Sequence, residues 1–344
     1  MPSEVFVLRI ASEFKLPNRW LWHLIFLLLG ASAFAQTCTM AADMDAPARA
    51  ALESAGKRYF QMAAQGDTAS LKQNSIAAVA AGFAGIEASV KDNQAAFAGA
   101  QGTVRPSFLL TAEGTVPLAR AEFLCGVFGS SGQTKNSTVF VLPNLPPGKY
   151  SLVILDVSGG SAAMTLTLVL QQIGNDWKLA GFFPRASQVA GHDAEWFLQR
   201  AAAFKTKSEN HNAWLYYREA IALSSPVDFM STLATDKLYD ETHAAQPTDV
   251  PVNGSSLDIA AAGKTYHLTE IFPLAVGADL DVVVKYQTAD VSDTARAFQE
   301  NMAVIKAVVA KFPELREAFA GVVARAVEPS GRDYGSLLPM KDVK

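Results

Sequence analysis

The chain has 344 residues, of which 50% are hydrophobic and 18% are charged, and its formal net charge is −4. This composition is typical of a globular protein with a sizeable core, and it excludes a largely disordered chain. No run of lysine and arginine forms a basic stripe, so we expect neither nucleic acid nor anionic lipid as a partner. The length predicts two or three domains.

The N-terminal segment has the features of an export signal. Its basic residues are Arg9, Lys15 and Arg19. An apolar run at residues 21–29 follows, and residues 33–35 (Ala-Phe-Ala) form a small-x-small cleavage site. We predict that residues 1–35 are a signal peptide, that the mature chain starts at Gln36, and that the protein is periplasmic or secreted without a stable membrane anchor. The alternative, a retained transmembrane helix, is disfavoured because the run breaks at Gly30, short of the roughly 20 apolar residues that a span needs.

Both cysteines, Cys38 and Cys125, lie in the predicted mature chain. An even cysteine count in an oxidising compartment favours one disulfide, which would tie the mature N-terminus to the strand-like segment 121–128. The alternative is a buried thiol at Cys125 and a free Cys38. Lipid attachment is disfavoured, because residues 35–37 do not form the Leu-x-small triplet of lipoprotein signals.

The mature chain begins with helical segments. Asp45 is placed to cap the first helix, Pro47 lies in its first turn, and Gly66 is placed to end it. The apolar stripe of this helix comprises Leu52, Ala55, Tyr59, Met62 and Ala63. A shorter helix is expected at residues 68–74 and an alanine-rich helical span at residues 76–100.

From Val104 onward the hydrophobic pattern has the period of two that is typical of β-strands. Turns rich in Gly, Pro and Asn separate the expected strands, which are residues 104–112, 121–128, 137–142, 150–157, 163–173 and 176–183. Long strands with turns of this kind predict an antiparallel meander.

Helices followed by a meander that ends in Trp177-Lys178-Leu179 and Gly181 resemble the cystatin-like, cone-shaped fold of nuclear transport factor 2 and the ketosteroid isomerases. The resemblance covers residues 45–185 and implies a domain at 36–187, with helices packed on a curved sheet. The turn at residues 143–152 is also similar to hairpins of immunoglobulin-like sandwich domains. A sandwich ranks second because it leaves the N-terminal helices unexplained.

Residues 186–192 are expected to form a linker, and residues 193–226 resemble one tetratricopeptide repeat. The matching positions are Phe197, Ala201, Phe204, Ala213, Tyr217 and Ala220. A further helical piece at residues 227–244 continues this layer, so we place a helical pair at 193–245. One repeat cannot bury its own faces, and we expect it to dock on a neighbouring domain.

Residues 246–256 are a second expected linker, followed by a small α+β domain at 255–344. Its expected elements are strands at 264–272 and 280–287, a helix at 292–312, and a closing hairpin at 322–327 and 334–340. The predicted fold class is therefore α+β: helices on a curved antiparallel sheet, then a helical hairpin layer, then a small antiparallel sheet with one long helix.

No catalytic constellation or cofactor site is apparent in the sequence. None of the mature-chain histidines (His192, His211, His243 and His267) has a second His or Cys at i+3 or i+4, so we expect no metal site. Ser54 and Lys57 match a Ser-x-x-Lys pattern, but its partner motifs are absent. The strands of the cone-like domain carry few carboxylates, so no buried acid or base is expected there.

These observations predict an exported, non-enzymatic binding or assembly protein of the cell envelope whose partner is another protein. The alternative is a small-molecule binder or enzyme that uses an apolar pocket in the cone-shaped domain. Four residues of the helical pair fall outside the repeat-like core positions and are candidates for a partner surface: Trp196, His211, Trp214 and Tyr216. The alternative for these side chains is that they dock onto the cone-like domain. The sequence does not determine the oligomeric state.

Overall fold

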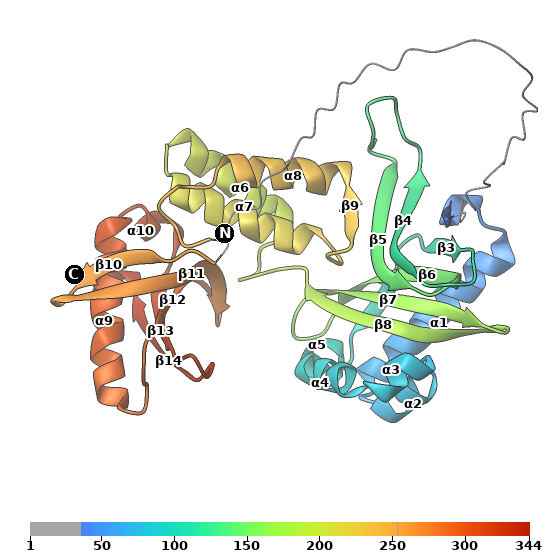
Figure 1. The fold of residues 1–344 in the computed structure, drawn as a ribbon, viewed down its shortest axis with the longest axis horizontal. Coiled ribbons are helices and arrows are strands. Elements are labelled where there is room, and N and C mark those ends of the chain that lie inside the picture. Colours follow the sequence, from blue (N-terminus) through green and yellow to red (C-terminus); the bar gives the residue numbers. More distant parts are fainter. Residues whose placement is uncertain (1–35, 253) are drawn as a thin grey trace, which may run out of the picture. The chain divides into compact units, whose positions relative to one another are not determined.

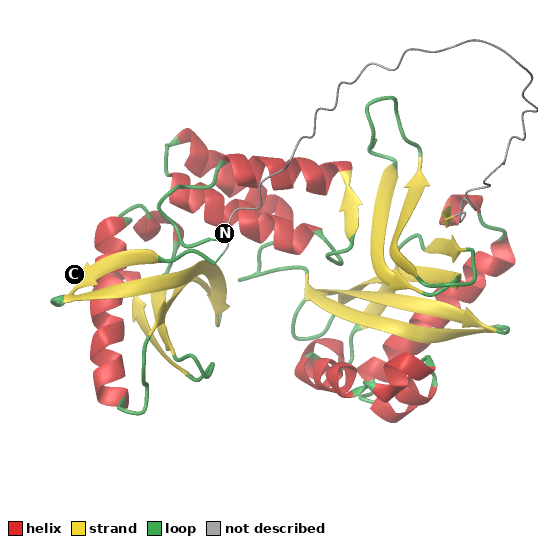
Figure 2. Ribbon diagram, in the orientation of Figure 1, coloured by secondary structure: helices red, strands yellow, loops and turns green. Residues whose placement is uncertain are grey.

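The computed structural model describes residues 36–252 and 254–344, and it shows a mixed α+β protein (Figures 1 and 2). This confirms the predicted fold class. The predicted signal peptide, residues 1–35, lies outside the described residues. No helix in the described ranges is long and apolar enough to cross a membrane.

The N-terminal helices begin where the capping pattern predicts. The Asp45 side chain accepts a hydrogen bond of 2.7 Å from the backbone N–H of Ala48. The helices are α1 (Ala46–Ala64), α2 (Thr68–Gln73), α3 (Ala77–Ala81), α4 (Ala84–Asp92) and α5 (Gln94–Phe97). The predicted alanine-rich span is thus three short helices, because Gly82 and Asn93 leave the helical conformation and interrupt it.

The long strands form a central antiparallel sheet, sheet A. Its members are β1 (Gln36–Met40), β2 (Gln101–Val104), β3 (Phe108–Ala112), β6 (Gly148–Ser158), β7 (Met164–Ile173) and β8 (Asp176–Ala186). The strand order is β1-β3-β6-β7-β8, and β2 pairs with β6. The N-terminal helices cover one face, where Tyr59, Phe97 and Leu166 belong to one apolar cluster.

A second antiparallel sheet, sheet B, covers the other face of sheet A. Its strands are β4 (Leu118–Gly126), β5 (Ser137–Leu145) and β9 (Met230–Thr232). Phe140 of β5 meets Phe108 of β3 with ring centroids 4.9 Å apart. The predicted disulfide is present: Cys38 of β1 is bonded to Cys125 of β4, with Cα atoms 5.1 Å apart, so it links the two sheets.

The helical pair and the C-terminal residues share one hydrophobic core. The pair consists of α6 (Ala194–Thr206) and α7 (Asn210–Ser224), and α8 (Leu233–Ala244) packs beside α7. The six repeat-like positions are all buried. The pair therefore docks as expected on a neighbouring unit, and that unit is the C-terminal α+β region.

The C-terminal region is a mixed sheet, sheet C, with a long helix on one face (Figure 1). In order along the sheet, its strands are β10 (Leu257–Ala261), β11 (Lys264–Val276), β12 (Asp279–Gln287), β13 (Gly321–Val327) and β14 (Asp333–Pro339). The helices are α9 (Thr294–Lys311) and the short α10 (Leu315–Ala318). The expected closing hairpin is present, but β12 and β13 are parallel, because α9 carries the chain across the sheet between them.

Candidate ligand groove

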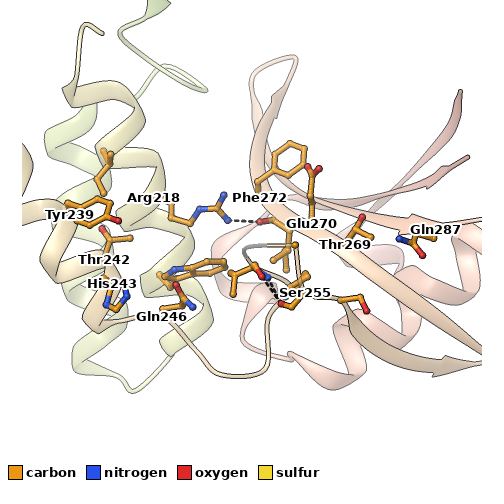
Figure 3. Close-up of a pocket in the computed structure, with 17 residues that line it drawn as sticks. Arg218, Tyr239, Thr242, His243, Gln246, Ser255, Thr269, Glu270, Phe272 and Gln287 are labelled. Atoms are coloured by element: carbon orange, nitrogen blue, oxygen red, sulfur yellow. Dashed lines mark hydrogen bonds between the residues drawn. The ribbon is translucent and has the colours of Figure 1, made fainter. Parts of the chain in front are cut away.

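A concave site lies between helices α7 and α8 and strands β11 and β12 (Figure 3). We call it the α8 groove. It has a volume of about 800 Å³, within the size range of ligand pockets. Residues 251, 252 and 254–256 line one side of it. Apolar and polar side chains both line the groove.

Arg218 of α7 reaches across the groove towards β11 (Figure 3). Its guanidinium carbon lies 4.7 Å from the centre of the Trp214 ring, and Nη1 donates a 2.9 Å hydrogen bond to the backbone oxygen of Ile271. Positions 214 and 218 are one helical turn apart, so the ring supports the guanidinium from the same face of α7. Arg218 forms no ion pair in the described part of the chain. Its guanidinium has five N–H donors, and the hydrogen bond to Ile271 leaves others available to a ligand.

The strand side of the groove is shaped by a β-bulge. The register between β11 and β12 shifts between Leu268 and Glu270, so the consecutive residues Thr269 and Glu270 both line the groove. Glu270 is paired with Lys285 on β12 at 2.9 Å, and the Lys285 ammonium lies 5.3 Å from the Phe272 ring centre. The one carboxylate that lines the groove therefore already has a cationic partner.

The α8 side is open to solvent. Tyr239 is 62% exposed, His243 lines the groove from the same helix, and Gln246 lines it from the segment that follows α8 (Figure 3). The Ser255 hydroxyl is engaged locally, because it donates to the backbone oxygen of Val252 at 2.6 Å. Among the described residues no histidine is hydrogen-bonded to a serine or cysteine, so this arrangement resembles a binding site more than a nucleophilic centre.

The four predicted surface residues do not form one exposed face. Trp214 and Tyr216 are each only 2% exposed and belong to the core shared with sheet C, which corrects the expectation of surface anchors there. Tyr216 donates to the Ala318 backbone oxygen at 2.6 Å, and burial raises the pKa of its phenol to about 12. Trp196 is partly buried, and it stacks on His192 at 3.6 Å between ring centres.

His211 joins three segments of the C-terminal half. Its Nδ1 lies 2.5 Å from Glu314 and its Nε2 lies 2.8 Å from Asp249. Burial raises the pKa of Asp249, but the hydrogen bond and charge of His211 and the charge of Lys311 outweigh this effect, so the pKa is lowered. His211 therefore ties α7 to the second linker and to the residues before α10, and its side chain is largely covered by these contacts.

Glu219 follows Arg218 on α7, and the pKa of its carboxyl is raised. Burial raises its pKa from 4.5 to about 6, although the Arg218 charge lowers it. Because the folded state favours the protonated acid, stability is lost as the pH rises from about 4.5 through about 6. We expect Glu219→Gln to raise the free energy of unfolding by up to about 2 kcal/mol above this window and to leave it unchanged below, as measured by urea unfolding.

The control for this prediction is Glu87→Gln, which changes an exposed carboxyl on α4. An effect of Glu219→Gln that does not vary with pH, or an equal effect in the control, would contradict the assignment of the pH dependence to Glu219.

The groove residues were not singled out in the sequence. Arg218 and Tyr239 lie on helices, and nothing in the local pattern distinguishes them from ordinary exposed side chains. The one available signal is the Trp214/Arg218 spacing of four, which brings an aromatic ring and a cation to the same face of an α-helix.

Among the described residues no group of three or more His, Cys, Asp or Glu side chains is placed to hold a metal ion.

Comparison with known proteins adds no relative: no family model matches the chain, and neither a curated protein nor a solved structure matches it.

Proposed function

We propose that the chain is an exported binding protein of the cell envelope that holds its partner or ligand in the α8 groove. The observation that carries this proposal is Arg218, which is fixed over Trp214, lacks an ion-pair partner among the described residues, and spans a groove of about 800 Å³. The Cys38–Cys125 disulfide supports an oxidising compartment.

The rival site inside the predicted cone-like domain has less support. Large side chains, including Tyr59, Phe97 and Leu168, fill the space between the N-terminal helices and sheet A. Phe97 makes edge-to-face contacts with both Phe60 and Phe182, at centroid distances of 6.1 and 6.2 Å. A region packed in this way favours a structural core over a ligand cavity.

Tyr239 is the residue through which the proposal is most directly tested. It is an exposed aromatic side chain at the groove, and such side chains are frequent energetic centres of interfaces. We expect Tyr239→Ala to lower the affinity for the bound partner about tenfold or more, because the ring loses its contact area. The measurement is quantitative recovery of bound species from native envelope extract on the immobilised mature chain.

The matched control is Phe298→Ala, which removes an exposed ring from α9. Both variants should melt at nearly the temperature of the unchanged protein, because neither ring is in the core. Equal recovery by Tyr239→Ala and Phe298→Ala would argue that the groove is not the binding site.

A further inference from the structure

The α8 groove carries an electrostatic asymmetry that indicates the chemistry of its ligand. Its cationic group, Arg218, forms no ion pair among the described residues, although the charges of Glu219 and Glu270 act on it, while its anionic group, Glu270, forms an ion pair with Lys285. The other polar residues that line it are neutral or weakly basic, such as Gln246, Thr269 and His243. Among the residues that line the groove, an added negative charge would therefore meet a cation that is in no ion pair and a carboxylate that already has a cationic partner.

The Arg218 guanidinium is also held in a defined orientation. Trp214 lies under its plane, and the hydrogen bond to Ile271 uses one donor. Arginine presents its donors in a planar fork that matches the two oxygens of a carboxylate. A guanidinium that is already ordered loses little conformational entropy when it binds such a group.

The rest of the groove is suited to an apolar body. Ile221, Val252, Ile271 and Phe272 line it beside the polar groups. Resting on the function proposed for this groove, we infer that its ligand carries a carboxylate that pairs with Arg218 and an apolar portion that lies along these side chains. Two sources share this chemistry, a free aliphatic or aromatic acid and the C-terminus of a peptide.

The test compares matched acids and amides on the mature protein. Octanoate and octanamide form one pair, and a pentapeptide with a free or an amidated C-terminus forms the other. We expect the acid of at least one pair to bind about 10- to 100-fold more tightly than its amide, since hydrogen bonds to a charged group exceed those to a neutral one by that factor. The pair that shows the preference identifies the source, and calorimetry reports binding.

Two substitutions with opposite expected effects on acid binding test whether Arg218 causes the preference for the acid. Arg218→Gln should remove the preference for the acid, whereas Glu270→Gln should tighten acid binding about two- to fivefold at low salt, because it removes a negative charge and releases Lys285. Arg120→Gln, at an exposed side chain of β4, is the matched control and should change neither value. The Glu270 result does not depend on whether the Arg218 variant folds well.

Equal binding of acid and amide in both pairs would overturn the inference, and so would an acid preference that survives Arg218→Gln. Either result is separate from the Tyr239 experiment, which measures recovery of the native partner. If the unchanged protein binds acid and amide equally, but Tyr239→Ala lowers recovery of the native partner, the groove is a binding site for a ligand of other chemistry.

Discussion

Reduction of the Cys38–Cys125 disulfide is expected to lower the free energy of unfolding by about 4 to 5 kcal/mol on the chain-entropy model. The two cysteines are 87 positions apart in the sequence, so reduction restores a long loop to the unfolded chain. The bond also joins β1 of sheet A to β4 of sheet B, and the Cys125 side chain is fully buried. Urea unfolding with and without reductant measures the difference.

The matched control is the double variant Cys38→Ser with Cys125→Ala, whose unfolding midpoint should not respond to reductant. Alkylation under denaturing, non-reducing conditions should leave the mass of the unchanged protein the same, because neither sulfur is a free thiol. Full alkylation before reduction, or a midpoint that reductant does not shift, would contradict the stabilising role of this bond.

Replacement of Trp214 by alanine is expected to cost about 3 to 5 kcal/mol of stability, the range measured for large-to-small changes at buried aromatic residues. The ring is 2% exposed and lies in the core that α7 shares with sheet C. It also supports the Arg218 guanidinium, so the same change should disorder the cation of the groove. Urea unfolding measures the first effect, and the acid preference described above measures the second.

Tyr239→Ala serves as the comparison, because it removes an aromatic ring from α8 that is largely exposed. That substitution should change the free energy of unfolding by no more than about 0.5 kcal/mol. If Trp214→Ala proved as mild as Tyr239→Ala, the ring could not be a core residue, and the prediction of a partner surface on the helical pair would regain support.

Strands β6, β7 and β8 of sheet A were predictable because their signal is local, whereas β1 was not predicted and the expected strand at 104–112 is divided into β2 and β3. In β6 and β7, long runs of buried β-branched and leucine residues stand between turn residues, and such runs are typical of strands that are covered on both faces. The cap at Asp45 and the disulfide were also predictable, the first from its spacing to the helix and the second from the even cysteine count in a chain with a predicted export signal.

The burial of Trp214 and Tyr216 was not predictable from helical periodicity. Periodicity assigns one buried face to a helix, but residues 212–217 of α7 are all buried. The helix packs against α6, α8 and strand β11, so neighbours enclose it on several sides. The short strand β9 escaped detection for a related reason, because its three residues form a strand only by pairing with β5.

The sequence by itself thus determined the alternation of helical and strand regions and the disulfide partners, because each depends on composition or on neighbours along the chain. The export signal stays a prediction, since it lies outside the described residues. Only the tertiary structure decided the parallel pairing of β12 with β13 and the α8 groove. Arg218, Tyr239 and Glu270 come from three separate elements. Their proximity follows from the packing of α8 on α7 and of α7 against β11, which is set by long-range burial and not by any local pattern.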